Sequence, residues 1–325
     1  MINKFEPKVF QLGYVALETA DIERSKDHYI ETIGMTETGK DDGGSVYLSI
    51  GYEHHNIVLR RGEKKTLLHL GFQLKPGTDL KDFAKEAQDY GVGAEFKSDS
   101  QPGISNLVEI EVPGGNLFQF YTDIEAPAPG FKKTGVAPLR LGHVAVISTE
   151  GEKLQKFYQD FLGFWYTDDF EGLATFLTCN RDHHVVNVVK LPESRVHHIA
   201  FQLKGSSDHA VACDTLREAG VKTLWGPARH TAGHNLAGYH YDPDKVLLEL
   251  YTDMDVFIPE LGMCEARPWH EHFPMKPKSW KLNELNAWGA EYGFTSLKLD
   301  CGRCCLSHRV SNEDGASIRA TRGGK

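Results

Sequence analysis

Short runs of hydrophobic residues alternate along the chain with amphipathic stretches that end beside a glycine. The runs are rich in Val, Ile, Leu and Phe, and turn sequences such as PGGN at residues 113–116 and DPDK at residues 242–245 separate the last two runs of each half, as in short strands joined by tight turns. The amphipathic stretches predict four helices, over residues 21–33, 80–90, 152–162 and 209–219. The pattern therefore predicts four βαβββ units and an α+β fold.

The second half of the chain repeats the first. LGYVALETADIERSKDHYIETIGM, which starts at Leu12, matches LGHVAVISTEGEKLQKFYQDFLGF, which starts 129 positions later at Leu141. We expect two homologous domains, over residues 8–126 and 137–256, each built from two βαβββ modules. Between them the sequence EAPAPGF has the Pro and Gly content of a linker.

The repeat stops near Asp255, and residues 257–325 are expected to form a C-terminal extension. Aromatic and histidine side chains in it predict a segment that lies over the surface or against a partner subunit: Trp269, His270, Phe273, Trp280 and Trp288. Further along come four potential zinc ligands, Cys301, Cys304, Cys305 and His308. Zinc ribbons normally present two separated ligand pairs, so we expect a loose tail here.

Composition and charge exclude several classes of protein. The chain has 325 residues, of which 40% are hydrophobic and 25% charged, and no run approaches the roughly 18 apolar residues of a membrane span. The net charge is −9 and the Lys and Arg residues are scattered, so we expect no nucleic-acid partner. The first residues lack the apolar core of a secretory signal, and we expect a cytoplasmic protein.

Three polar residues lie within second-half runs that otherwise predict core strands. His143 opens HVAV, His198 opens HIAF, and Glu249 lies within LLELY. Burying a carboxylate among leucines is costly unless a cation compensates its charge. Two histidines and one carboxylate also form the facial triad of non-haem Fe(II) oxygenases, which leaves positions open for substrate and O₂. We therefore predict that these three residues bind a metal.

The first half lacks this ligand set, because Tyr14, His69 and Gln119 occupy the corresponding positions. We expect this half to be degenerate and to bind no metal. In the second half the ligand histidine at 198 must be distinguished from its neighbour His197, since successive side chains of a strand point to opposite faces. Both predicted ligand histidines are followed by an apolar residue, alanine and another apolar residue, which favours His198.

The residues around this ligand set resemble the extradiol ring-cleavage dioxygenases of the vicinal oxygen chelate superfamily, in particular catechol 2,3-dioxygenases. In that family a histidine precedes a tyrosine by nine positions, and the tyrosine precedes the ligand glutamate by ten. His230, Tyr239 and Glu249 reproduce both intervals. The family also places an active-site histidine fourteen positions before the second ligand histidine, as His184 stands before His198.

The resemblance covers about residues 8–255 and implies a fold and a reaction. Each domain is expected to form a curved, glyoxalase-like sheet, and the second sheet is expected to enclose the metal. The metal is expected to be Fe(II), with Mn(II) as the alternative. With O₂, the enzyme would cleave a catechol next to its two hydroxyl groups, giving a 2-hydroxymuconic semialdehyde type product in aromatic degradation. The family also implies a homo-oligomer, which we expect to be a tetramer.

The resemblance further assigns catalytic roles and a substrate class. His184 is expected to act as base toward the second substrate hydroxyl and later as acid, while His230 and Tyr239 orient substrate oxygen. Family members that act on catechols with an acidic side chain place an arginine where this chain has Trp225. A tryptophan cannot pair with a carboxylate as arginine does, so we expect catechol or uncharged substituted catechols.

Two other functions stay open from the sequence. Metal-dependent glyoxalases and isomerases of the same superfamily need no O₂, but they usually complete the metal site with a further carboxylate, for which Tyr14 and Gln119 offer no candidate. A metal-free protein that sequesters ligands would leave the six residues of the predicted site without a role.

Overall fold

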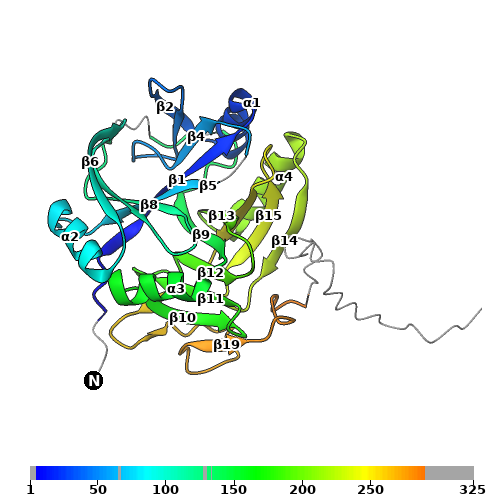
Figure 1. The fold of residues 1–325 in the computed structure, drawn as a ribbon. Helices are drawn as coiled ribbons and strands as arrows, with labels where there is room; N and C mark the ends of the chain where they lie inside the picture. The colour runs from blue at the N-terminus through cyan, green and yellow to red at the C-terminus, as the bar shows by residue number, and fades with distance from the viewer. Residues whose placement is uncertain (1–4, 65–66, 127–129, 133, 290–325) are drawn as a thin grey trace, which may run out of the picture. The chain divides into compact units, whose positions relative to one another are not determined.

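A computed structural model describes residues 5–64, 67–126, 130–132 and 134–289, and two large β-sheets dominate this part of the chain (Figure 1). The first-half strands are β1 (Val9–Thr19), β2 (Thr36–Lys40), β3 (Val46–Ser49), β4 (Ile57–Arg61), β5 (Leu67–Leu74), β6 (Ala94–Gln101), β7 (Ile104–Glu111) and β8 (Leu117–Tyr121). They form one sheet in the order β2-β3-β4-β1-β5-β8-β7-β6.

The second sheet repeats this order. Its strands are β9 (Arg140–Ser148), β10 (Trp165–Phe170), β11 (Ala174–Thr178), β12 (Val186–Lys190), β13 (Arg195–Gln202), β14 (Thr223–Arg229), β15 (Leu236–Tyr241) and β16 (Leu247–Thr252). Starting from β10 they run β10-β11-β12-β9-β13-β16-β15-β14, which is the first order with every strand replaced by its counterpart. The sequence repeat is therefore a repeat of sheet topology.

The first helix of each half changes its winding partway along. α1 (Ile22–Asp27) continues into a π-helix, η1 (His28–Ile33), and α3 (Gly151–Lys156) continues into η2 (Phe157–Phe161). The side chain of Asp21 accepts a hydrogen bond from Arg24 N at the start of α1. Gly34 ends η1 with φ 91°, a left-handed conformation that glycine adopts without strain.

The other two helices follow the predicted stretches closely. α2 (Leu80–Tyr90) has the predicted bounds and ends at Gly91, whose φ is 102°. α4 (Ser206–Glu218) begins three residues before the predicted start. Its first turn is polar, so the apolar periodicity used for the prediction could not show it.

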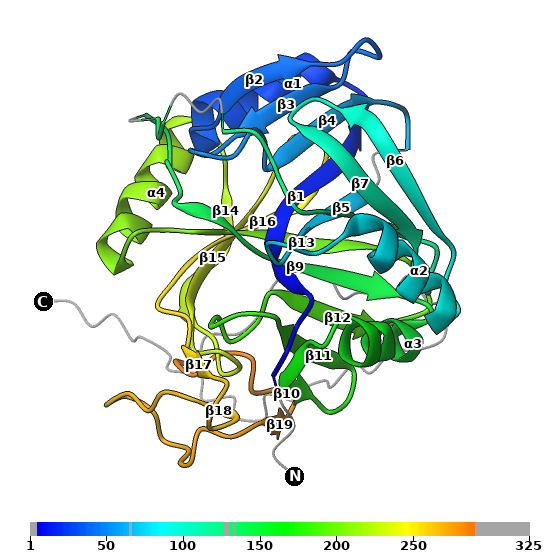
Figure 2. The ribbon, with the colours of Figure 1, turned by 90° about the vertical axis from the view of Figure 1, so that its left-hand side faces the viewer.

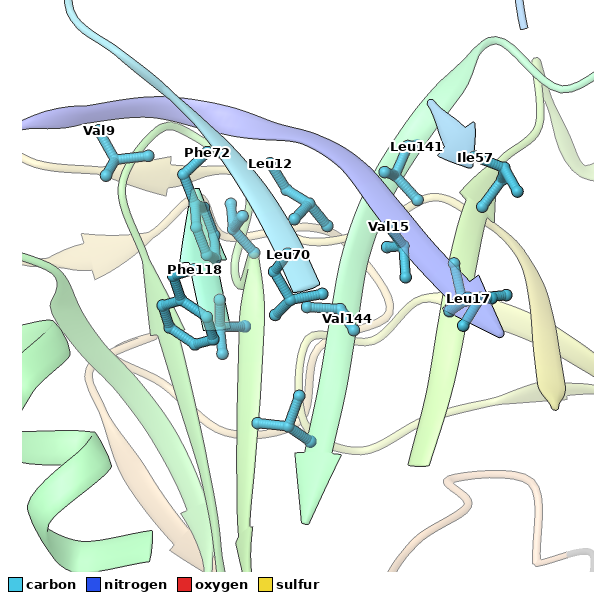
Figure 3. Packing of buried hydrophobic residues seen from close by; sticks show 14 of the residues in the cluster. Val9, Leu12, Val15, Leu17, Ile57, Leu70, Phe72, Phe118, Leu141 and Val144 are labelled. Carbon is cyan, nitrogen blue, oxygen red and sulfur yellow. The ribbon is translucent and has the colours of Figure 1, made fainter. Parts of the chain in front are cut away.

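The two halves share a hydrophobic core. β1 and β9 lie side by side (Figures 1 and 2). Figure 3 shows Val15 and Leu17 of β1 in the same cluster as Leu141 and Val144 of β9, and all four side chains are buried. None of the helices within the described ranges is long and apolar enough to cross a membrane.

Part of the C-terminal extension packs against the second sheet. It contains β17 (Phe257–Ile258), β18 (Met263–Cys264) and β19 (Lys278–Trp280), and β19 pairs in parallel with β10. Trp280 and His270 are buried, whereas Trp269, Phe273 and Trp288 are exposed. The predicted linker prolines and the Cys301, Cys304, Cys305 and His308 cluster lie outside the described residues.

Candidate metal centre

Three neighbouring strands of the second sheet carry the predicted ligands. His143 lies in β9, His198 in β13 and Glu249 in β16, and β13 pairs with both other strands. Ala200 of β13 is the register partner of His143 on one side and of Glu249 on the other. His198 stands two residues before Ala200, so strand alternation places its side chain on the face of Ala200. The register thus brings the three side chains to one part of the sheet.

The ligand atoms of these residues converge. One nitrogen of each histidine and one carboxylate oxygen lie within 4.8 Å of one another, and all three residues are buried. His143 Nε2 and His198 Nε2 are each 3.1 Å from Glu249 Oε2. In the described part of the chain His198 Nε2 nevertheless finds no hydrogen-bond partner. The lone pair of His198 Nε2 is therefore available to bind a metal.

Burial sets the protonation of these groups. It lowers the pKa of His143 and lowers the pKa of His184 well below its ordinary value, which favours neutral imidazoles. Burial alone would raise the pKa of Glu249, but its contacts with His143 and His198 outweigh that effect and hold its pKa well below the usual range. Neutral imidazoles beside an ionised carboxylate are the protonation states that bind a divalent metal.

Further polar groups surround the Glu249 carboxylate. The Tyr239 hydroxyl donates to Oε2 over 2.8 Å, and Asn235 Nδ2 donates to Oε1 over 2.8 Å. His230 Nε2 lies 2.7 Å from the Tyr239 hydroxyl oxygen and 3.8 Å from Glu249 Oε1. Burial lowers the pKa of His230 to about 4. The structure thus places His230 and Tyr239 beside the metal ligands.

His184 also lies against the ligand set. Its ring centroid is 4.3 Å from that of His143, and its side chain is buried. Its Nδ1 lies 3.0 Å from the Nδ1 of His183. The six residues predicted from the sequence therefore gather in one buried place, while their chemical roles stay predictions.

The expectation that paired histidines point to opposite faces is wrong. His197 Nδ1 lies 2.7 Å from His198 Nδ1, and the His183 and His184 rings are in contact at their Nδ1 atoms. Alternation fails in the first pair because β13 has an irregular register between Val196 and His198. It fails in the second pair because both histidines precede β12 instead of lying in it.

His234, in the loop between β14 and β15, is buried. Its Nδ1 lies 2.7 Å from Asp255 Oδ2, and His270 Nε2 lies 2.9 Å from Asp255 Oδ1. These groups form a second cluster of potential ligands. Arg267 N donates to His270 Nδ1 over 3.1 Å, which places the proton of a neutral His270 on Nε2, facing the carboxylate. The C-terminal extension contributes His270 to this cluster, a contact that the residues around His234 do not indicate.

Hydrogen-bonded neutral groups occupy the equivalent place in the first half. The Tyr14 hydroxyl donates to Gln119 Oε1 and accepts from Gln101 Nε2 over 2.8 Å. Gln119 Nε2 donates to Glu109 Oε2 over 2.8 Å. The His69 ring lies 5.7 Å from the Tyr14 ring. Two of the three counterparts of the predicted ligands, Tyr14 and Gln119, are thus hydrogen-bonded to each other.

Sequence reasoning missed several polar residues of the site, namely Asn235, Asp168, His183 and His197. The available signal was the His-His doublet, which occurs at 183–184 and 197–198. Asn235 and Asp168 carried no signal, because each reaches the site through contacts between distant segments.

Trp225 lies at the edge of the site. Its ring stacks on His230, with centroids 5.3 Å apart and planes 14° from parallel. Arg229, the nearest basic residue in the sequence, turns away: its guanidinium donates to His234 O over 2.8 Å and lies 5.6 Å from the ring centroids of Trp269 and Trp288.

Comparison with known proteins finds similarity to one superfamily in the second half and to extradiol dioxygenases along most of the chain. The family model Glyoxalase/Bleomycin resistance protein/Dioxygenase superfamily matches residues 140–250. The chain is 25% identical over 308 residues to the manganese-dependent 2,3-dihydroxybiphenyl 1,2-dioxygenase of Geobacillus genomosp. 3, covering 87% of this chain and 96% of the relative. It is 26% identical over 258 residues to a 3-methylcatechol 2,3-dioxygenase of Pseudomonas putida, covering 74% and 88%. It is 23% identical over 309 residues to an iron-dependent extradiol dioxygenase of Rhodococcus jostii, covering 86% and 96%.

Solved structures share the fold. The 2,3-dioxygenase LapB of Pseudomonas sp. KL28 aligns with a TM-score of 0.75 and 22% identity, covering 85% of this chain and 98% of that one. A Mn(II)-bound glyoxalase of Novosphingobium aromaticivorans aligns equally well, with a TM-score of 0.75 and 22% identity over 87% and 92%. The predicted α+β fold is confirmed, and so is the resemblance recognised in the sequence.

Proposed function

We propose that this vicinal oxygen chelate protein is a metal-dependent extradiol dioxygenase that uses O₂ to cleave catechol or uncharged substituted catechols. The observation that carries the proposal is the buried set of His143, His198 and Glu249 with His184, His230 and Tyr239 around it. The relatives act as extradiol dioxygenases on catechol-type diols, which supports the same reaction class here. The site would belong to the second domain, residues 137–256, with the first domain, residues 8–126, as a degenerate copy.

The ligand set fits a divalent metal. Metal bonds of about 2.1 Å at right angles place neighbouring ligand atoms about 3.0 Å apart, close to the 3.1 Å from each histidine nitrogen to Glu249 Oε2. The histidine nitrogen without a hydrogen-bond partner and the fully buried carboxylate also fit a bound cation. His143, His198 and Glu249 would hold the metal, and Fe(II) is the proposed ion, with Mn(II) as the alternative.

The metal, when bound, would act as a Lewis acid that makes the catechol more acidic and holds it beside O₂. The protein's own groups would handle the protons. His184, neutral because of its burial, would accept the proton of the second substrate hydroxyl and return it later. The Tyr239 hydroxyl and His230, 2.7 Å apart, would orient a substrate oxygen on the other side of the ligand set.

A glyoxalase or isomerase is the less favoured function. The glyoxalase structure shares the fold at 22% identity, so the fold does not separate the two reactions. Within the described ranges the metal-ligand group at this site has three members and no second carboxylate. That set leaves room for both a catechol and O₂, as the facial triad does.

Trp225 supports a preference for uncharged substrates. Its buried ring is stacked on His230, so it presents an apolar face beside the proposed orienting residue. The guanidinium of Arg229 is engaged by its contacts with His234 O and two tryptophans. A substrate carboxylate placed against Trp225 would lose its hydration without gaining a charge partner.

The test is to reconstitute the metal-free protein under anaerobic conditions with Fe(II) or Mn(II) and to measure cleavage of three catechols in air-saturated buffer. We expect the higher turnover with Fe(II), and kcat/KM for catechol and 3-methylcatechol about 100-fold above that for homoprotocatechuate. Trp225→Arg is the matched variant and should narrow this ratio. Equal kcat/KM values for the three substrates in the unaltered protein would contradict the proposal that Trp225 disfavours charged substrates.

A further inference from the structure

A buried carboxylate reaches His184 through its neighbouring histidine. Asp168 Oδ2 lies 3.2 Å from His183 Nε2, and His183 Nδ1 lies 3.0 Å from His184 Nδ1. The exposed fractions of the three residues are 6%, 2% and 3%. The three side chains therefore form a continuous chain of polar contacts that water does not interrupt.

The direction of the hydrogen bonds in this chain follows from the chemistry of its first member. An ionised carboxylate can only accept hydrogen bonds. His183 Nε2 must therefore carry a proton and donate a hydrogen bond to Asp168. A neutral His183 then has an unprotonated Nδ1, which accepts a hydrogen bond from the N–H at His184 Nδ1. His184, also neutral, is left with an unprotonated Nε2, the nitrogen that can act as a base.

Asp168 is fixed by the C-terminal extension. Trp280 Nε1 donates to the same Oδ2 over 2.8 Å, and the backbone N–H of Lys278 donates to Oδ1 over 2.8 Å. Both donors belong to β19, which pairs with β10, the strand of Asp168. The edge strand therefore holds the carboxylate in the position from which it contacts His183.

The first half provides a comparison within the same chain. His54 and His55 are the counterparts of His183 and His184, and their Nδ1 atoms are 2.9 Å apart. The counterpart of Asp168 is Gly39, where an added Cβ would lie 3.7 Å from His54 Nε2. The degenerate half thus keeps the histidine doublet in the same arrangement but has no carboxylate beside it at this position.

We propose that Asp168 and His183 are positioning residues that hold the proton of His184 on Nδ1 and keep its Nε2 free to accept a proton from the substrate. This inference rests on the proposed dioxygenase function. If His183 were instead charged, it would donate from both nitrogens, and the proton of His184 would sit on Nε2.

The test compares Asp168→Asn with Asp169→Asn. Asp169 is the matched control, because it also bonds β10 to β19, through Ser279 Oγ over 2.6 Å, and it bonds Tyr166 as well. Among the described residues, Asp169 hydrogen-bonds Tyr166, Gly172 and Ser279 and neither histidine of the doublet. If Asp168 only holds the edge strand in place, the two variants should behave alike.

The readout is the visible spectrum of 4-nitrocatechol bound without O₂ to the Fe(II)-loaded proteins, because the singly and doubly ionised forms of this probe absorb differently. We expect the doubly ionised form in the unaltered protein and in Asp169→Asn. Asp168→Asn should retain iron but bind mainly the singly ionised form. In air its kcat should be about 10-fold or more lower, with KM changed less than about threefold.

His183→Phe serves as a second variant in case Asp168→Asn does not fold. It keeps a ring in place but cannot accept a hydrogen bond from His184. It should therefore also retain iron, bind mainly the singly ionised probe and have a lower kcat. The doubly ionised probe and unchanged kcat in both Asp168→Asn and His183→Phe would overturn the proposal. Failure of the proposed function would look different, since the unaltered protein would then neither ionise the probe nor consume O₂ with catechol.

Discussion

Glu249 is the residue on which the proposed metal centre depends most. It is the carboxylate member of the predicted ligand set, and it is buried in β16, next to the strand of His198. Tyr239 and Asn235 each donate a hydrogen bond to it, and His143 and His198 approach the same oxygen. A buried carboxylate with these neighbours is stable as an anion only while its charge is compensated.

Replacing Glu249 by glutamine should therefore remove the metal while keeping the size of the side chain. Loss of an outer partner of a metal ligand costs about 10- to 100-fold in metal affinity, and loss of the anionic ligand should cost at least as much. Elemental analysis of purified Glu249→Gln should find little bound metal. The control is Gln119→Ala in the first half, which should bind about as much metal as the unaltered protein. A full metal content in Glu249→Gln would contradict the ligand assignment.

Two of the three proposed ligands stand out in the sequence because the repeat supplies an internal comparison, whereas His198 stands against another histidine, His69. A histidine or glutamate of the second half stands against Tyr14 or Gln119 in the first, in strands that are otherwise alike. The supporting residues had no such contrast. Asp168 and Asp169 are adjacent and identical in type, and only the tertiary structure shows that one contacts His183 while the other bonds Ser279.

At the scale of elements, an irregularity in β9 positions His143. The register between β9 and β13 shifts around Gly142, and β1 and β5 show the same shift around Gly13. A Cβ at Gly142 would lie 1.9 Å from the Tyr251 hydroxyl oxygen, and one at Gly13 would lie 1.7 Å from that of Tyr121. Both halves thus use a glycine to admit a tyrosine, but only in the second half does the tyrosine pack on a ligand, with its ring 4.9 Å from His143.

Gly142→Ala and Gly13→Ala form a matched pair. Both should lower the melting temperature, because each added methyl group forces a buried tyrosine to move. Only Gly142→Ala should also weaken metal binding, by about 10-fold or more, since the displaced Tyr251 presses on His143. Titration of both metal-free variants with Fe(II) measures this. Equal affinities in the two variants would show that the Tyr251 contact does not position His143.

The elements themselves were predictable to different degrees. α2 matched its expected bounds, because its amphipathic pattern and terminal glycine agree. The change from α-helix to π-helix at His28 and at Phe157 was not predictable, since no periodicity in the sequence marks it. β19 was also missed, because its three residues are too few for a strand pattern and depend on pairing with β10.

At the scale of the whole molecule, polar contacts join the two halves near the buried carboxylate of Asp242. The Tyr29 hydroxyl of the first half donates to Asp242 Oδ2 over 3.0 Å, and Ser25 Oγ donates to Asp244 over 2.6 Å. Burial is the largest cause that raises the pKa of Asp242, to about 6. The folded protein therefore favours the protonated acid, and this contribution to stability is present below pH about 4 and is lost as the pH rises through about 6.

Asp242→Asn should be more stable than the unaltered protein at pH 8 and about equally stable at pH 4. The shift of about two pKa units corresponds to at most about 3 kcal/mol. The amide oxygen can still accept from the backbone N–H of Val246, while the amide nitrogen can donate to the Tyr29 hydroxyl oxygen. Melting temperatures at the two pH values measure the difference, with the exposed Asp123→Asn as control. An equal change at both pH values would contradict a buried charge at Asp242.

In the proposed reaction the protein cleaves catechol next to its hydroxyl groups with O₂. The most direct measurement combines an oxygen electrode with the visible spectrum while the Fe(II)-loaded protein turns over catechol. We expect one O₂ to be consumed per catechol and a yellow semialdehyde product to form at the same rate. Absence of O₂ uptake by the iron-loaded protein, or O₂ uptake with a colourless product cleaved between the two hydroxyl groups, would contradict this expectation.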